Sequence, residues 1–522
     1  MNRTESSTRS RGVLPLVLAS LALVVAAVPA LNVALPDVAE ETGATQSQLQ
    51  WIVDAYALVF AGLLLPAGAL GDRFGRRPLL VLGLAVFGGG SAAAALCHTP
   101  GPLIAARALM GVGAAMVMPT TLSIITSSFP VQQRAKAVGA WIGVAGAGAI
   151  LGLLASGMLL ERLGWQSVFW LNVVLAGGVA VAALRRIPNS RDERRPAVDL
   201  VGGLLLTVAL SCVVYGSIEG PELGWTDGLT LGMFGAGAAA TLLWLLWSLR
   251  IPEPLLDPRL FLHRSFTTGV LSISAQFFVF FGFVFLVIQY LQMALGYTPL
   301  RAGLALLPMA MVLGGLSRNA PRLAAHLSRR AMSVGGVLLV AAGMLVLSLL
   351  EGGSSYWLLL AGIVPLGAGM ALATAPATTG IVAALPASQQ GVGSAVNDAA
   401  REVGGALGIA VLGSVLNGVY RSDVSSGLAT ADPHVALPAQ DSLPAALTVA
   451  ARLGEPGNAV AVVARDAYVQ GMGTAFAVSA AVLVVVAAVL AIVQRHGPAV
   501  VVDDAASDEA AVEVRALAGA AS

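Results

Sequence analysis

The stretch Gly68–Arg77 reads GALGDRFGRR and connects two apolar runs, Trp51–Ala67 and Pro78–Cys97. Each run approaches the roughly 20 residues that a helix needs to cross a bilayer. The connection carries three arginines and one aspartate, so we expect a turn in the headgroup region on the side that retains positive charge. Its glycines let two helix ends approach closely, and Asp72 can accept from a helix N-terminus, where an anion is favoured. An ordinary basic cytoplasmic turn would explain the arginines alone.

The composition indicates a membrane protein. Hydrophobic residues make up 57% of the chain and charged residues 11%, against roughly 25% charged residues in soluble domains, and the mean hydropathy is +0.83. The net charge of +1 predicts no nucleic-acid partner. The sequence contains no P-loop, no H-E-x-x-H motif and no cluster of cysteine and histidine, so we expect no ATP site, no metal, no cofactor and no enzyme activity.

Apolar runs of about spanning length follow one another along the chain and predict an all-α membrane protein with 14 transmembrane helices. The first run is longer than a signal-peptide core, so we expect an uncleaved helix. The predicted spans are Val13–Leu35, Trp51–Leu70, Pro78–Cys97, Leu103–Ile125, Ala137–Leu159, Val168–Leu184, Leu200–Ser217, Leu229–Leu249, Thr267–Leu291, Ala302–Leu316, Met332–Leu350, Tyr356–Thr378, Gly404–Val419 and Gly473–Val493.

Basic residues collect in alternate loops, as expected if every run spans the membrane. An even number of spans then places both termini in the cytoplasm. Within this scheme we expect a cytoplasmic tail at 1–12, six helices at 13–195, two inserted helices at 196–250, six more at 251–495 with a long extracellular loop at about 420–470, and a disordered cytoplasmic tail at 496–522. Within the loop, Ala445–Arg465 is a candidate amphipathic surface helix with a poorly defined apolar face.

An internal repeat links the fourth and twelfth predicted spans. Gly111–Thr121 and Gly367–Thr378 each begin Gly-x-Gly and contain a proline. Further along, each segment reaches a second proline followed by a Gln-Gln pair. Two related bundles of six helices around a central cavity are a transporter design, and the two extra helices would then lie between the bundles. Chance similarity between helices rich in glycine and alanine is the alternative.

The Gly68–Arg77 stretch resembles the loop motif G-x-L-(A/G)-D-R-x-G-R-(R/K) between the second and third spans of the major facilitator superfamily, with every position filled. The resemblance extends along nearly the whole chain and is strongest to the fourteen-span drug:proton antiporters. It implies two six-helix bundles, two additional helices and alternating access. The gating-loop residues that it implies are Gly68, Gly71, Asp72, Arg73, Gly75, Arg76 and Arg77.

Two charged residues are candidates for coupling. Arg107 lies inside the fourth span, where a charge costs several kcal/mol unless it is paired or hydrated, and it matches the arginine of the family motif R-x-x-x-G-x-G-A-A. Snorkelling from a helix end is its alternative. The family's first-span aspartate is replaced here by Ala27. Asp54 in the second span is a possible substitute proton site, or else a solvated residue at a helix end.

The family's fifth-span antiporter signature is altered, because Leu153 and Ser156 stand where it has proline and glycine. Asn397, Asp398, Arg401 and Glu402 open the thirteenth span as a cytoplasmic gate or as a solvated helix start. The candidate substrate-cavity residues are Asn32, Tyr56, Gln276 and Gln289. The candidate hinge and packing residues are Gly111, Gly113, Pro119, Gly152, Gly157, Gly367, Gly369 and Pro376.

The sequence therefore predicts a monomeric secondary transporter in a bacterial plasma membrane. By resemblance it would export amphipathic drugs or secondary metabolites in exchange for protons. Ala27 and Leu153 leave open an uncoupled facilitator or importer of a small organic solute. A membrane sensor or membrane enzyme would need an effector domain or a catalytic cluster, and neither is apparent in the sequence.

Overall fold

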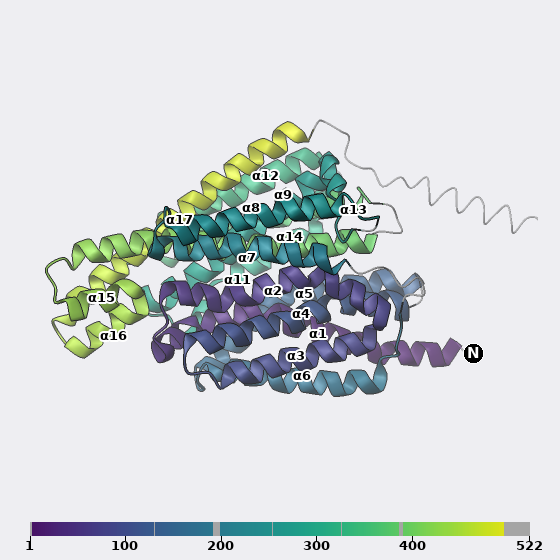
Figure 1. The fold of residues 1–522 in the computed structure, drawn as a ribbon, viewed down its shortest axis with the longest axis horizontal. Helices are drawn as coiled ribbons and strands as arrows, with labels where there is room; N and C mark the ends of the chain where they lie inside the picture. The colour runs from purple at the N-terminus through teal and green to yellow at the C-terminus, as the bar shows by residue number, and fades with distance from the viewer. Residues whose placement is uncertain are drawn as a thin grey trace, which may run out of the picture.

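The computed structural model describes residues 3–129, 131–191, 199–252, 254–324, 326–385 and 390–494. Within these ranges the chain is helical and contains no strand, as the sequence predicts. The first six helices form one half of the molecule (Figure 1). They are α1 (Arg3–Thr42), α2 (Gln46–Phe74), α3 (Arg76–Ala95), α4 (Pro100–Ser128), α5 (Val131–Leu160) and α6 (Gln166–Arg186).

Two helices, α7 (Leu200–Leu223) and α8 (Gly228–Ser248), then connect the first half to the second. A short 3₁₀ turn, η1 (Pro258–Leu262), precedes the second half, and a π-helical turn, η2 (Tyr290–Ala294), ends its first helix. The helices of that half are α9 (Arg264–Gln289), α10 (Pro299–Ala305), α11 (Leu307–Ala324), α12 (Arg329–Leu347), α13 (Tyr356–Val382), α14 (Gln390–Gly427), α15 (Pro433–Asp441), α16 (Leu443–Leu453) and α17 (Gly457–Val493).

Thirteen helices among the described residues are long and apolar enough to cross a membrane, counting α10 and α11 as one. The 30-residue α5 is not among them. Its sequence carries no charged residue between Ala137 and Leu160, so we count it as the fourteenth span. The number of helices is thus close to the prediction.

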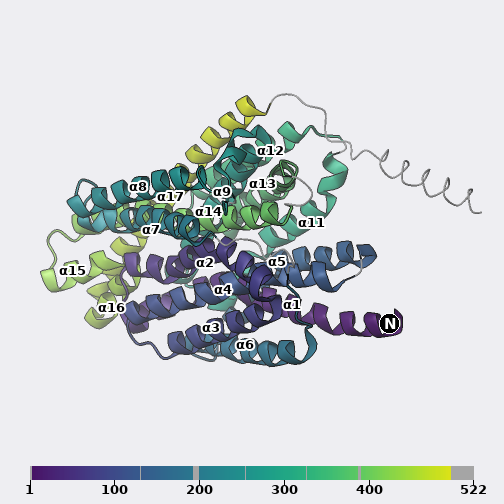
Figure 2. The ribbon, with the colours of Figure 1, turned by 45° about the vertical axis from the view of Figure 1, so that its right-hand side comes forward.

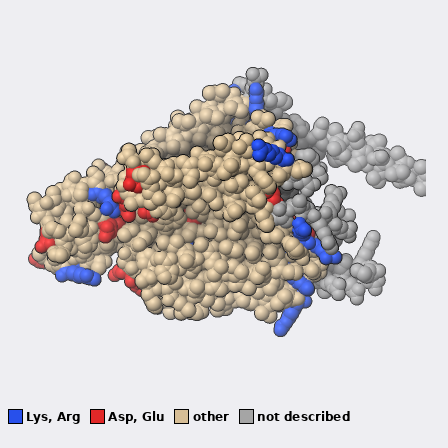
Figure 3. All heavy atoms as spheres, in the orientation of Figure 1, with Lys and Arg blue, Asp and Glu red and all other residues tan. Residues whose placement is uncertain are grey.

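The two halves lie side by side, and α7 lies between α2 and α14 in both ribbon views (Figures 1 and 2). Leu242, Leu243 and Leu246 on α8 are exposed, as expected for a lipid-facing helix. Arginine side chains gather at the end of the molecule where α1 begins, and acidic side chains with fewer arginines gather at the opposite end (Figure 3). We call the first end the basic end and the other the acidic end.

The internal repeat has a structural counterpart in how α4 and α13 pack. A Cβ atom on Gly111 of α4 would lie 2.6 Å from the carbonyl oxygen of Tyr56 on α2, and one on Gly367 of α13 would lie 2.7 Å from that of Met309 on α11. Only glycine permits such close helix contact. The second glycine of each pair makes the equivalent contact with the next helix, Gly113 with Gly83 on α3 and Gly369 with Gly336 on α12.

Several helices extend beyond the predicted spans. α1 is helical from Arg3, so the part of the predicted N-terminal tail that is described continues the first span. α14 continues to Gly427 and α17 begins at Gly457, so the connection predicted at 420–470 is shorter and contains α15 and α16. The candidate helix Ala445–Arg465 is divided at Gly454, where the backbone turns with φ +66°. The predicted C-terminal tail lies outside the described residues.

Candidate transport path

The predicted gating loop is mostly helical. α2 continues through Phe74, and only Gly75, with φ +122°, separates it from α3. A side chain is strained at that φ, so glycine permits the abrupt turn. Asp72 does not cap α3, contrary to the role considered from the sequence. Its Oδ1 accepts hydrogen bonds from Nε and Nη2 of Arg76 at 2.9 and 2.8 Å.

The rest of the motif contacts α4 and the segment after α6. The Arg76 amide donates to the carbonyl of Ser190 at 2.9 Å, and Arg77 donates to the carbonyl of Ile187 at 3.4 Å. Arg73 is exposed. A Cβ on Gly68 would lie 3.4 Å from Pro119 of α4, and one on Gly71 would lie 3.4 Å from Thr120. The motif therefore joins the basic ends of α2, α3, α4 and α6.

Arg107 is fully buried between α4 and α2. Its Nε donates to the carbonyl of Ile52 at 3.0 Å, and its guanidinium carbon lies 4.4 Å from the ring centroid of Tyr56. The Tyr56 hydroxyl donates to the carbonyl of Val24 on α1 at 3.1 Å. Nη2 of Arg107 has no hydrogen-bond partner. Arg107 therefore points into the N-half and does not snorkel to a helix end.

Asp54 is also fully buried, and neither carboxylate oxygen has a hydrogen-bond partner. It lies one turn from Gln50, whose side chain would contact a Cβ on Gly413 of α14 at 2.6 Å. Residues four apart share a helix face, so Asp54 lies on the side of α2 that meets the C-half. Among the described residues no ion pair joins it to Arg107. The two predicted coupling residues are therefore separate features.

The predicted cavity residues do not form one cluster. Gln276 and Gln289 on α9 lie more than three turns apart, about 20 Å at 1.5 Å per residue. Gln276 accepts a hydrogen bond from Thr374 of α13 at 2.9 Å, so it joins two helices of the C-half. Gln289 and Asn32 each donate to their own helix backbone and leave a buried oxygen without a partner. Both side chains are polar groups with spare hydrogen-bonding capacity.

The fifth helix and its partners pack through small residues. A Cβ on Gly152 would lie 2.5 Å from the carbonyl oxygen of Ala26 on α1, and the Ser156 hydroxyl donates to the carbonyl of Ala30 at 2.7 Å. A Cβ on Gly157 would lie 2.8 Å from Leu300 of α10. Pro376 is buried in α13. The serine that replaces the motif glycine therefore bonds the two helices together.

An aromatic and charged group lies where α9 meets the first turns of α14. Phe277, Phe280 and Phe281 pack ring against ring with centroids 5.5 to 6.1 Å apart. The Arg401 guanidinium lies 5.1 Å from the Phe277 ring and 4.0 Å from Asp398. An apolar surface with a few charged groups suits binding of amphipathic molecules. The sequence predicts Asp398 and Arg401 as part of a gate or of a solvated helix start, and the phenylalanines of this helix as the lining of an apolar cavity or as a lipid-facing surface.

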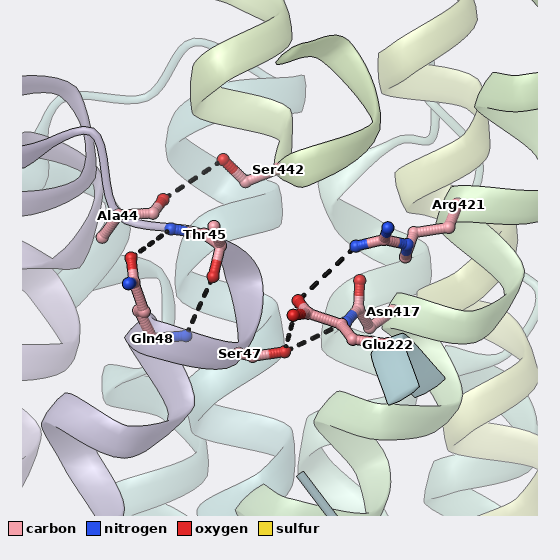
Figure 4. A network of polar contacts seen from close by, with 8 residues as sticks. All are labelled: Ala44, Thr45, Ser47, Gln48, Glu222, Asn417, Arg421 and Ser442. Carbon is pink, nitrogen blue, oxygen red and sulfur yellow. Dashed lines mark hydrogen bonds and ion pairs between the residues drawn. The ribbon is translucent and has the colours of Figure 1, made fainter. Parts of the chain in front are cut away.

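Hydrogen bonds between the halves occur at the acidic end (Figure 4). The Ser47 hydroxyl on α2 donates to Glu222 of α7 at 2.8 Å and accepts from Nδ2 of Asn417 on α14 at 3.3 Å. Arg421 of α14 lies 3.5 Å from the same Glu222 oxygen.

Two more hydrogen bonds join the halves, and the first of them is also drawn in Figure 4. The Ser442 hydroxyl donates to the carbonyl of Ala44 at 3.4 Å, and Gln292 donates to that of Val33 at 2.9 Å. The acidic end is therefore closed across the halves. Sequence reasoning missed Ser47, Gln50, Glu222 and Asn417, because no motif marks these residues.

Asp441 lies close to this network, outside the spans. Burial and the charge of Glu222 raise the pKa of its carboxyl, and the charge of Arg421 opposes them. A separate cavity of about 880 Å³ opens at the acidic end beside α17. It is lined by Glu351, Arg465 and Asp466 among others and contains none of the predicted cavity residues, so we do not assign the transport path to it.

Comparison with known proteins places this geometry in a family. Residues 17–409 match the model of the Major Facilitator Superfamily. The chain is 34% identical over 419 residues to the Multidrug resistance protein Stp of Mycobacterium tuberculosis, covering 80% of this chain and 76% of Stp. It is 34% identical over 503 residues to the Multidrug efflux pump LfrA of Mycolicibacterium smegmatis, covering 94% and 99%.

A third relative is the Methyl viologen resistance protein SmvA of Salmonella typhimurium, 35% identical over 398 residues, covering 76% of this chain and 80% of SmvA. Among solved structures, a bacterial homologue of the human lysosomal transporter Spinster, inward-facing and unoccupied, aligns with a TM-score of 0.65. That alignment covers 94% of this chain and 98% of the homologue at 16% identity, so it shows the fold alone.

Proposed function

This chain belongs to the Major Facilitator Superfamily, and we propose that it exports amphipathic drugs or secondary metabolites across the bacterial plasma membrane in exchange for protons. Its curated relatives are named as multidrug, viologen and antibiotic resistance or efflux proteins. The transporter would act as a monomer. Both termini would lie in the cytoplasm, because arginine gathers at the end where α1 begins and the predicted number of spans is even.

The observation that carries the proposal of proton coupling is the buried Asp54 without a partner. Ionising a carboxyl that has no hydrogen bond and no counter-charge costs several kcal/mol. Asp54 therefore binds a proton while the acidic end is closed. If the acidic end faces outward, opening it would let water reach Asp54, and closing it would require a proton from outside.

Arg107 supports the same cycle from inside the N-half. Because its guanidinium bonds the α2 backbone at Ile52 and faces the Tyr56 ring, it holds α2 against α4. A change in the protonation of Asp54 acts on that same helix. The motif at Gly68–Arg77 ties the basic ends of α2, α3, α4 and α6 together, so the N-half would move as one body in alternating access.

Substrate would bind between the two halves, on the basic side of the closed acidic end. The Phe277, Phe280 and Phe281 group supplies an apolar aromatic surface, and Asp398 and Glu402 supply carboxylates beside it. Aromatic faces attract organic cations, so cationic dyes and viologens are the first compounds to test. Asn32 and Gln289 offer free amide oxygens for orienting a ligand.

The test is expression in a bacterial host that lacks its own drug pumps, with and without an uncoupler. We expect raised resistance to methyl viologen and to cationic aromatic dyes, with dye efflux that the uncoupler abolishes. Asp54→Asn should lose efflux at unchanged membrane level. Efflux that persists with the uncoupler would favour the alternative, an uncoupled facilitator. If the cells that express the protein instead lose resistance and accumulate dye, the proposed direction of transport is wrong.

A further inference from the structure

The inserted helix α7 contacts both halves of the molecule, but not in the same way. It follows α2 along most of its length, from Ser47 at the acidic end to Pro66, which a Cβ on Gly203 would approach to 2.6 Å. Trp51 donates to Glu219 at 2.7 Å and packs against the ring of Tyr215. Helix α7 is therefore docked on the N-half over several turns.

The contacts of α7 with the C-half run along α14 from the middle of that helix, at Ala406, to its acidic end, at Arg421. Ala406 and Ala410 of α14 pack with Val214 and Ile218 of α7 in one apolar cluster. Beyond them the Ser414 hydroxyl donates to the carbonyl of Ser217, and Arg421 pairs with Glu222.

At the basic end, Asp199 at the start of α7 accepts hydrogen bonds from Trp247 and from the amide of Leu255, in the connection that leads to α9. This end of α7 is fixed to the chain segment that links the halves, so it can act as a pivot.

From this asymmetry we infer that α7 is a clamp which moves with the N-half and holds the acidic end closed, with Glu222 as its positioning residue. Glu222 accepts from Ser47 of the N-half and faces Arg421 of the C-half with the same oxygen. Opening the acidic end breaks the contacts of α7 with Arg421 and Ser414 and keeps those with Ser47 and Trp51.

The first experiment measures distances between spin labels in a variant without Cys97 and Cys212. The labels replace Thr99 in the N-half, Thr226 in the α7–α8 turn and Ser426 in α14, all of which are exposed near the acidic end. Glu222→Lys reverses the charge that faces Arg421. Loss of an exposed ion pair of this kind should increase the population of the open state by up to about fivefold. The repulsion between the two like charges adds to this increase.

In Glu222→Lys we expect the distances from Ser426 to both other labels to lengthen, while the distance from Thr99 to Thr226 stays unchanged. The double variant Glu222→Lys/Arg421→Glu should restore the short distances. Glu455→Lys, at another exposed acidic residue of this end, is the matched control and should change nothing. Unchanged distances in Glu222→Lys, or a Thr226 label that stays with Ser426, would overturn the inference.

A second measurement does not depend on reversing the charge. A short reducible thiol cross-linker should block transport when it joins Glu222→Cys to Arg421→Cys, and leave it intact when it joins Glu222→Cys to Ser47→Cys. Reductant should restore the blocked variant. Transport through both cross-links, or through neither, contradicts a clamp that moves with the N-half. Only this readout rests on the proposed function, because the label distances are measured without substrate.

Discussion

Replacing Asp54 by asparagine tests the coupling mechanism most directly. The amide keeps the shape of the side chain but cannot ionise. Asp54 is fully buried without a partner in the closed state, so closing the acidic end on the ionised form costs several kcal/mol. Taking about 4 kcal/mol, and 1.36 kcal/mol for each factor of ten, ionisation disfavours closure by about a thousandfold.

The sign of the pH dependence follows from proton linkage. The closed state binds one more proton than the open state, so the ratio of open to closed molecules rises tenfold per pH unit over about three units. The spin-label pair at Thr99 and Ser426 measures that ratio in reconstituted protein. In the Asp54→Asn variant this site should add nothing to the change of the ratio with pH. Any remaining change would come from other acids of the spans, such as Asp398 and Glu402.

Two results would refute this reasoning. One is a wild-type ratio that does not depend on pH although both distance populations are visible. The other is a full slope of one in Asp54→Asn. Asp54→Glu is the matched control, because it keeps an ionisable group on the same face of α2 and should keep the slope. Insertion and thermal stability of each variant are checked by detergent gel filtration and a melting curve.

Four further predictions use the same protein. Asp72→Asn, which leaves Arg76 with a weaker acceptor, should lose transport with insertion preserved, and wild-type efflux would remove the gating role. Arg107→Lys should keep the charge but lose the planar contact with the Tyr56 ring, so efflux should fall at least tenfold while expression stays normal. Gly113→Ala places a Cβ 2.5 Å from the amide nitrogen of Phe87, so the melting temperature should drop by several degrees, whereas Gly89→Ala, which has open space, should leave it unchanged. Cysteines at Arg73 and Arg191 should both be labelled only from the cytoplasmic side, and labelling from opposite sides would reject the topology.

The sequence by itself determined the class of protein and the order of its helices. Spans about 20 residues long leave a signal that needs no tertiary information, because lipid accepts only continuous apolar helix. The motif at Gly68–Arg77 indicated the family for a similar reason: its glycines and charges act locally, at one helix junction. The repeated Gly-x-Gly of the fourth and twelfth spans also appeared in the sequence, since each glycine pair contacts neighbouring helices of its own half.

Only the tertiary structure decided which polar residues meet. It left Asp54 without a hydrogen-bond partner and joined Arg107 to the carbonyl of Ile52. It placed Gln276 and Gln289 about 20 Å apart along α9. It also brought Ser47, Glu222 and Arg421 together across 175 residues of chain and more. These contacts depend on how helices rotate about their axes and pack against each other. Hydropathy measures the length of a helix in lipid and carries little information about that rotation.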